Sequence, residues 1–293
     1  MHRVATHIFV ALIPIVTFSF GLLLLAGSPP EDVFEHEYSE PELVKDFTFS
    51  ATGTVKARSW YVFDLASNQV LLSNREDELL PIASITKLFS TALFNKYATT
   101  SSEVLLTNSD ANVLGITGNL NAGDRLNMRE LSILSLLVSS NVAATAQARL
   151  YPYDLIEAMN RYTAGAGLSA SEVVFTDTSG LSSGNRATAR ALGNLLSYLY
   201  HQDPYVLEVT RLRQYMNESK GWKNNSPFIE ESGYLGGKHG YTPEAGRTAV
   251  VLFEESVANG PDRVIGYVVL GSNDVHKDVT SLRALVRASV RYE

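Results

Sequence analysis

Strand-like segments lie near both ends of the chain, and most of the sequence between them has helical periodicity. Residues 59–64 alternate large apolar and aromatic side chains, and after a short turn residues 70–72 return as the second strand of a hairpin. Residues 247–253 and 263–271 are two further apolar runs joined around Asn259-Gly260, a hairpin signal. The pattern predicts an α/β (α+β) fold. Its antiparallel sheet is assembled from both ends of the chain, with a helical insertion between them.

The segments with helical periodicity are spaced along the middle and the end of the chain. They cover residues 84–98, 127–138, 141–150, 153–164, 188–201 and 278–292. Asn127 and Glu130 form a capping-box pattern at the start of the second segment. The last segment carries Arg283, Arg287 and Arg291 four residues apart, and we interpret this stripe as a solvated helix face.

An uncharged segment precedes the body. Residues 8–27 are a run of 20 mostly apolar residues, which as a helix of about 1.5 Å per residue would span a bilayer of about 30 Å. A cleaved signal peptide is the alternative, but its apolar region is usually only about 7–15 residues long, and no small-residue cleavage triplet follows Leu25. We therefore expect residues 8–27 to be a transmembrane anchor or an uncleaved signal. Residues 1–7 would then be cytoplasmic, and the rest of the chain would lie outside a cell membrane that it crosses once.

The negative charge is concentrated in one short segment. The whole chain has a net charge of −7, and residues 28–49 carry seven acids against Lys45, a net of −6. With prolines among the acids, this segment is typical of an extended stalk. Residues 50–293 are then nearly neutral, which argues against a nucleic-acid partner. We expect them to form one folded domain. The chain has no cysteine, which excludes disulfides, thiolate metal sites and cysteine nucleophiles.

Ser84 and Lys87 form an S-x-x-K pair at the start of the segment 84–98. On a helix, residues three apart share one face, so a neutral Lys87 amine could accept the Ser84 proton. Lowering a lysine pKa from about 10.4 to about 7 costs about 4–5 kcal/mol. Burial together with a second nearby cation can supply that shift. By itself the pair is weak evidence, because a serine that begins an ordinary helix gives the same pattern.

Two further motifs follow in order. Ser139-Ser140-Asn141 is an S-x-N, and Lys238-His239-Gly240 places a lysine among glycines. Together with S-x-x-K, they resemble the S-x-x-K, S-x-N and K-T-G set of penicillin-binding proteins and serine β-lactamases. Flanking segments narrow the resemblance to low-molecular-mass penicillin-binding proteins of the D-alanyl-D-alanine carboxypeptidase family, over about residues 50–293. These segments are residues 76–90, 123–124, 175–181, 185–189 and 238–246.

The resemblance implies that residues 50–293 are a catalytic domain of the β-lactamase/transpeptidase-like fold, with no C-terminal β domain. That fold has an antiparallel sheet of about five strands, flanked by helices, and an inserted all-α subdomain. The resemblance also implies a serine-type D-Ala-D-Ala carboxypeptidase that acts on peptidoglycan stem peptides and is covalently inhibited by β-lactams. It implies that Ser84 attacks the carbonyl between two terminal D-alanines and that Lys87 is the general base. Ser139 and Asn141 would hold the substrate and relay protons. The reaction needs no metal and no cofactor.

The third motif is expected to bind the substrate. The resemblance assigns Lys238 to the substrate carboxylate, with His239 and Gly240 beside it, and makes the N–H groups of Ser84 and Tyr241 the oxyanion hole. His239 departs from the usual threonine and could add a pH dependence near 6.5. Val142 follows Asn141, where aspartate is common.

Several alternatives stay open. A D,D-endopeptidase, a transpeptidase or a β-lactamase would use the same motifs, and a catalytically inactive, membrane-tethered peptidoglycan-binding module would keep them without activity. Residues 180–184 also spell G-x-S-x-G, the nucleophile elbow of an α/β-hydrolase. In that case Ser182 would be the nucleophile, with Asp203 and either His239 or His276 completing a triad.

Overall fold

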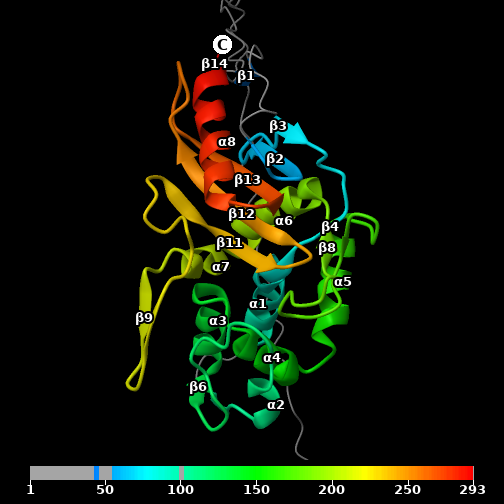
Figure 1. Ribbon diagram of the computed structural model, residues 1–293, viewed down its shortest axis with the longest axis vertical. Helices are drawn as coiled ribbons and strands as arrows, with labels where there is room; N and C mark the ends of the chain where they lie inside the picture. Colours follow the sequence, from blue (N-terminus) through cyan, green and yellow to red (C-terminus); the bar gives the residue numbers. More distant parts are fainter. Residues whose placement is uncertain (1–42, 46–54, 99–101, 293) are drawn as a thin grey trace, which may run out of the picture. The chain divides into compact units, whose positions relative to one another are not determined.

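The central sheet has five antiparallel strands from two distant parts of the chain. The computed structural model describes residues 43–45, 55–98 and 102–292. The strand order is β11-β12-β13-β2-β3 (Figure 1), which confirms the predicted sheet. The strands are β2 (Ser59–Asp64), β3 (Val70–Asn74), β11 (Tyr234–Thr242), β12 (Gly246–Glu255) and β13 (Arg263–Ser272).

Both faces of the sheet are buried. Successive side chains of a strand point to opposite sides, and each side packs into an apolar cluster. On β2, Trp60 and Val62 belong to the apolar cluster beneath helix α8 (Val275–Ser289). Tyr61 and Phe63 belong to the larger cluster on the other face, which includes helix α6 (Ala189–Gln202). A five-stranded sheet therefore lies between helical layers, and its β11 edge remains available for a site.

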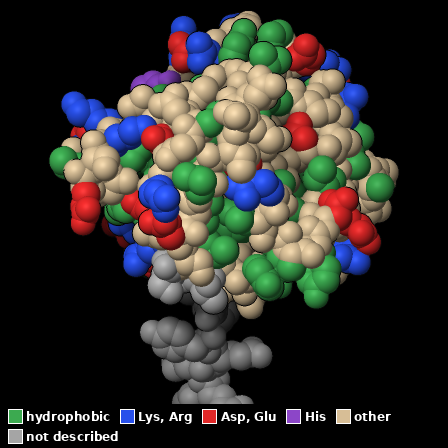
Figure 2. All heavy atoms as spheres, turned by 90° about the horizontal axis from the view of Figure 1, so that it is seen from below, with side chains coloured by type: hydrophobic (Ala, Val, Ile, Leu, Met, Phe, Trp, Pro, Cys, Tyr) green, Lys and Arg blue, Asp and Glu red, His purple; other side chains and the backbone are tan. Residues whose placement is uncertain are grey.

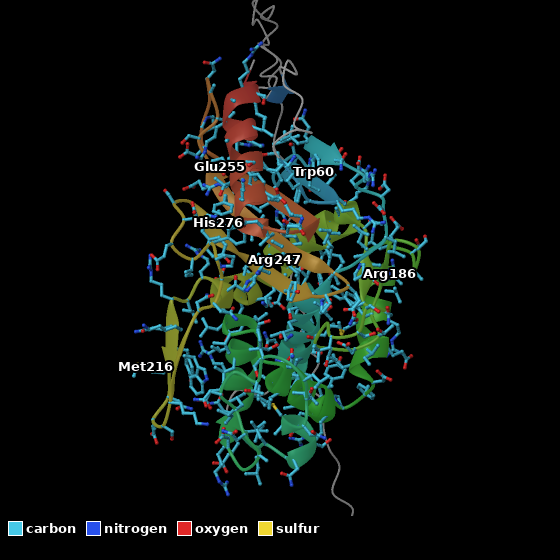
Figure 3. The ribbon with its side chains drawn as sticks, viewed as in Figure 1. Trp60, Arg186, Met216, Arg247, Glu255 and His276 are labelled. Atoms are coloured by element: carbon cyan, nitrogen blue, oxygen red, sulfur yellow. The ribbon has the colours of Figure 1, made fainter. Side chains whose placement is uncertain are left out.

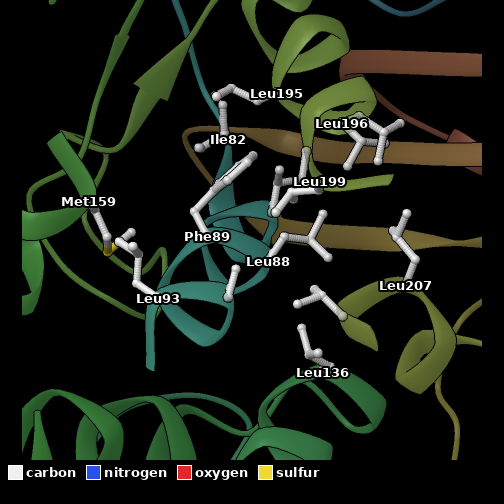
Figure 4. Packing of buried hydrophobic residues seen from close by; sticks show 14 of the residues in the cluster. Ile82, Leu88, Phe89, Leu93, Leu136, Met159, Leu195, Leu196, Leu199 and Leu207 are labelled. Carbon is white, nitrogen blue, oxygen red and sulfur yellow. The ribbon is translucent and has the colours of Figure 1, made fainter. Parts of the chain in front are cut away.

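Helix α1 (Thr86–Tyr97) is the centre of the larger cluster. Figure 4 shows its Leu88 and Phe89 among leucines of α6 and of α7 (Pro204–Thr210), with Leu136 of α3 (Met128–Leu137) beside them. Short antiparallel strand pairs accompany these helices, so the insertion is not purely helical. The remaining helices are α2 (Asn108–Ala111), α3 (Met128–Leu137), α4 (Asn141–Leu150), α5 (Leu155–Gly165) and α7 (Pro204–Thr210). The added strands are β4 (Leu80–Pro81), β5 (Glu103–Leu105), β6 (Arg125–Asn127), β7 (Val173–Val174), β8 (Arg186–Ala187), β9 (Gln214–Met216) and β10 (Gly221–Lys223).

The two ends of the described chain pair with each other. Strand β1 (Leu43–Lys45) is antiparallel to β14 (Val290–Tyr292). Helix α8 therefore ends at Ser289, before the predicted end at residue 292. Strand β1 lies within the segment that was expected to be a stalk. The expected anchor, residues 8–27, lies outside the described residues. Within the residues that are described, no helix combines the length and the apolar character needed to cross a bilayer.

Charged side chains of both signs are interspersed over the face drawn in Figure 2, without a broad patch of either sign there. This distribution agrees with the nearly neutral charge counted for residues 50–293. A nucleic-acid surface would need basic side chains gathered on one face.

The interpretation of the arginine stripe as a solvated helix face is wrong for Arg283. Its side chain is buried, and its Nε donates to Oε1 of the fully buried Glu255 at 2.5 Å. Arg287 Nε donates to the other carboxylate oxygen at 2.7 Å, and the Tyr267 hydroxyl to Oε1 at 3.1 Å. Figure 3 shows Glu255 beside α8. A buried carboxylate needs such partners. The helical periodicity of the sequence could not reveal that β12 places a buried acid against this face of α8.

Replacing Arg283 with methionine should lower the free energy of unfolding by about 3–5 kcal/mol, because the variant leaves buried Glu255 short of a cation. Arg213→Met, which removes the exposed pair with Glu230, should cost at most about 1 kcal/mol. Urea denaturation monitored by tryptophan fluorescence measures both. Equal losses in the two variants would contradict the buried-pair account.

Candidate active site

Ser84 and Lys87 lie on successive turns at the start of α1. Ser84 is in a 3₁₀ turn (Ala83–Ile85) that leads directly into the helix, and Ser84 Oγ is 2.9 Å from Lys87 Nζ. The preceding residue, Ala83, has a φ of 49°, a left-handed conformation that non-glycine residues rarely adopt. This turn places Ser84 at the N-terminal end of α1, one turn before Lys87, as the S-x-x-K spacing predicts.

The Lys87 amine is fully buried and has three oxygen neighbours. Besides Ser84 Oγ, Nζ is 2.8 Å from Asn141 Oδ1 and 2.5 Å from the carbonyl oxygen of Ser179. Burial holds the pKa of Lys87 well below its usual 10.5, and the Lys238 cation lowers it further, whereas Asp177 acts in the opposite direction. The site therefore favours a neutral amine beside the serine hydroxyl, the state that a general base requires.

The S-x-N motif connects α3 to α4. Ser140 caps α4, since its Oγ accepts from the Ala143 N–H at 3.1 Å. Asn141 is then the first helical residue; its Nδ2 donates to the Leu114 carbonyl at 2.7 Å while its Oδ1 faces Lys87. Ser139, with a φ of 59°, is buried in the turn between the two helices. Ordinary capping thus explains Ser140 but leaves Ser139 and Asn141 for the site.

Lys238 lies on the edge strand β11 and is buried. Its Nζ donates to the His239 carbonyl at 2.9 Å, and burial lowers its pKa to about 7. Two residues along, a Cβ on Gly240 would lie 2.6 Å from the backbone nitrogen of Ser84. Only glycine lets the strand approach the nucleophile so closely. Tyr241 is exposed, with the Arg247 guanidinium 5.4 Å from its ring centroid.

The two departures from the family pattern have different structural settings. His239 is half-buried, and burial, with the nearby charges of Lys238 and Arg247, keeps its pKa well below 6.5. Its imidazole is therefore neutral near pH 7, which corrects the expectation of a titration near 6.5 in the free protein. Val142 is fully buried in the larger apolar cluster, so it packs the helices and takes no part in the polar site.

The alternative nucleophile Ser182 is not in a triad. Its Oγ accepts from Thr176 Oγ1 at 2.9 Å and from the Gly184 N–H at 3.1 Å. In the described part of the chain no histidine is hydrogen-bonded to this Oγ, and His276 is hydrogen-bonded to Glu231 at 2.8 Å. The G-x-S-x-G stretch instead overlaps the turn whose Ser179 carbonyl contacts Lys87. Sequence reasoning missed that contact, because a backbone carbonyl leaves no trace in a motif.

The structure thus brings Ser84, Lys87 and Asn141 into hydrogen-bond contact, places Gly240 against Ser84, and brings the charge of Lys238 close enough to act on Lys87. The catalytic and binding roles assigned to these residues, and to Ser139 and His239, stay predictions. So does the oxyanion hole. Because β11 is an edge strand, alternate N–H groups on it face away from β12, as a role for Tyr241 requires.

Comparisons with known proteins agree with this geometry. A family model described as D-alanyl-D-alanine carboxypeptidase matches residues 45–273. The chain is 28% identical over 234 residues to a D-alanyl-D-alanine endopeptidase of Pseudomonas aeruginosa, covering 76% of this chain and 74% of that protein. It is 28% identical over 269 residues to the D-alanyl-D-alanine carboxypeptidase DacC of Escherichia coli, covering 85% and 64%. Penicillin-binding protein D2 from Listeria monocytogenes, in its ampicillin-bound form, is similar with a TM-score of 0.68 and 25% identity over 79% of this chain and 96% of that one.

Proposed function

The chain belongs to the D-alanyl-D-alanine carboxypeptidase family, and on this basis we propose that it removes the terminal D-alanine from peptidoglycan stem peptides as a serine-type carboxypeptidase. The observation that carries the proposal is the fully buried Lys87 amine, 2.9 Å from Ser84 Oγ. A serine hydroxyl is a weak nucleophile unless a neighbouring base accepts its proton. Few reasons other than this chemistry explain why a lysine should be buried beside a serine hydroxyl with its pKa held well below the usual value.

The proposed acylation step starts from the hydrogen bond between Ser84 Oγ and Lys87 Nζ. As Ser84 Oγ attacks the carbonyl carbon between the two D-alanines, its proton passes to the Lys87 lone pair. The carbonyl oxygen becomes an oxyanion, and the N–H groups of Ser84 and Tyr241 are the donors proposed for it. The C–N bond then breaks, and the departing amine takes a proton from the Lys87 ammonium, directly or through Ser139. Water later attacks the ester carbonyl while Lys87 accepts its proton. The C–O bond to Ser84 then breaks, Oγ takes that proton from Lys87, and the shortened peptide leaves with a new carboxyl group.

Lys238 gives the proposed enzyme its preference for a free carboxylate. Its Nζ has one acceptor, the His239 carbonyl, among the described residues, so further donors of the ammonium remain for an anion. A D-alanine carboxylate bound there would stabilise the charged form of a lysine whose pKa is about 7 in the free enzyme. The neutral His239 imidazole, beside it on β11, offers one N–H to the same carboxylate.

The proposal also covers location. We propose that residues 8–27 anchor the chain in the cell membrane and that the enzyme works outside it, since its proposed substrate is the cell wall. The support is the uncharged apolar run and the single flanking Arg3. Protease added to intact spheroplasts should remove the folded domain, while the same domain should stay protected if the chain remained cytoplasmic.

The central prediction is a single penicillin adduct on Ser84. Mass spectrometry of peptides from the penicillin-treated protein should find it there, Ser84→Ala should abolish it, and Ser182→Ala should leave its rate unchanged. An adduct on Ser182 would instead support the hydrolase alternative. A protein that forms no adduct and releases no D-alanine would be an inactive binding module.

The reaction products separate the alternatives that share Ser84. Release of D-alanine from a pentapeptide supports the carboxypeptidase, whereas cleavage of a cross-linked dimer alone supports an endopeptidase, the activity named for the Pseudomonas relative. A D-alanine acceptor incorporated into product would indicate transpeptidation. A penicillin adduct that turns over in well under a second would indicate a β-lactamase.

A second prediction concerns pH. Because kcat/KM reports the ionisation of the free enzyme, and Lys238 must be charged to attract the substrate carboxylate, kcat/KM should fall as pH rises through about 7. A matched substrate that ends in D-alaninamide has no carboxylate and should lose this alkaline limb. The same limb with both substrates would show that another group is titrating.

A further inference from the structure

The three neighbours of Lys87 fix the direction of its lone pair. A neutral amine has two N–H donors and one lone pair. Asn141 Oδ1 at 2.8 Å and the Ser179 carbonyl at 2.5 Å can only accept hydrogen bonds, so they take the two N–H groups. The lone pair is then left facing Ser84 Oγ at 2.9 Å, ready to accept its proton. The Ser179 carbonyl is therefore needed for the direction of proton transfer.

One carboxylate holds the turn that carries this carbonyl. Oδ1 of Asp177 accepts from the N–H groups of Ser179 at 2.8 Å and Gly180 at 2.6 Å. Its Oδ2 accepts from the N–H of Ser182 at 2.6 Å. Three backbone donors of residues 177–182 thus converge on one side chain, which fixes the orientation of the peptide groups between them.

The turn is also pressed against the nucleophile. Gly180 has a φ of 84°, and a Cβ there would lie 2.0 Å from the Ala83 carbonyl oxygen and 2.9 Å from the Ser84 nitrogen. On the other side, Ser90 Oγ of α1 donates to the Thr178 carbonyl at 2.9 Å. A change in the shape of the turn would therefore reach both the general base and the backbone of the serine.

We propose that Asp177 is a positioning residue of this reaction, whose carboxylate fastens the turn 177–182 so that the Ser179 carbonyl directs the lone pair of Lys87 at Ser84. The inference rests on the proposed function, since it concerns acylation of Ser84. Its competitor is a purely structural role, such as that of Asp154. The Oδ1 atom of Asp154 accepts from the N–H groups of Ile156 and Glu157 and caps α5, and Asp154 is not among the charges that shift the pKa of Lys87.

The two roles differ in electrostatics as well as geometry. The charged and titratable groups that act on Lys87 are Asp177, which favours its protonated form, and Lys238; His239 also faces this pair of lysines. Removing the Asp177 charge should lower the pKa of Lys87 further. The acylation rate constant falls at low pH because Lys87 becomes protonated. This fall, the acid limb of the pH profile, should then move to lower pH.

The experiment measures the rate constant of penicillin acylation against pH for Asp177→Asn, a nearly isosteric change. Its new amide would face the Ser182 N–H donor in place of Oδ2, so the turn should loosen. We expect the plateau rate to fall about 10²-fold, the non-covalent affinity for penicillin to stay the same, and the acid limb to move down in pH. Asp154→Asn, the matched control, should change neither the rate nor the limb.

Ser90→Ala separates geometry from charge and serves as the second variant if Asp177→Asn fails to fold. It releases the turn from α1 without altering any charge, so the plateau rate should fall while the acid limb stays in place. A wild-type rate and limb in Asp177→Asn, or unchanged acylation in Ser90→Ala, would overturn the inference. Failure of the wild-type protein to acylate at all would instead refute the proposed function.

Discussion

The whole site depends on keeping one amine buried and uncharged. Lys87 is completely inaccessible, and a cation in such a place without a counter-ion would be strongly disfavoured. The fold meets this constraint with parts from separate regions: the first turn of α1, the start of α4, the turn 177–182 and the edge strand β11. Their carbonyl oxygens accept the two N–H groups of the amine, and the charge of Lys238 disfavours a third proton. The packing that buries the Lys87 amine is therefore also what makes Ser84 reactive in the proposed mechanism.

Much of the fold and the centre of the site could be predicted from sequence, because the signals were local. Strand alternation identified both hairpins, and S-x-x-K spacing places Ser84 and Lys87 one turn apart whatever surrounds them. Asn141 and Lys238 depended on the family resemblance, since nothing in the spacing says that residues so far apart meet. The role of Asp177 could not be predicted, because its carboxylate binds backbone N–H groups, which no sequence motif identifies.

The arginine stripe shows the same limit from another side. Arg283 looked like a surface residue because arginine usually is one, but a buried acid on β12 faces it. The sheet consequently has two kinds of polar burial. Beneath α8, the ionic cluster around Glu255 is closed by its own partners. At the β11 edge, Lys238 has spare donors. The first is suited to stability, and the second to binding an anion.

The origin of the sheet in both ends of the chain also affects when the enzyme can become active. In the register of the sheet, Val62 of β2 lies opposite Tyr267 of β13, so β2 must wait for a strand that is synthesised much later. Contacts so distant in sequence form slowly. A nascent chain that already contains the serine and its base still lacks β11, the strand that carries Lys238 and packs Gly240 against Ser84. Catalytic competence thus comes only after β11, β12 and β13 have been synthesised, and the nucleophile stays idle until then.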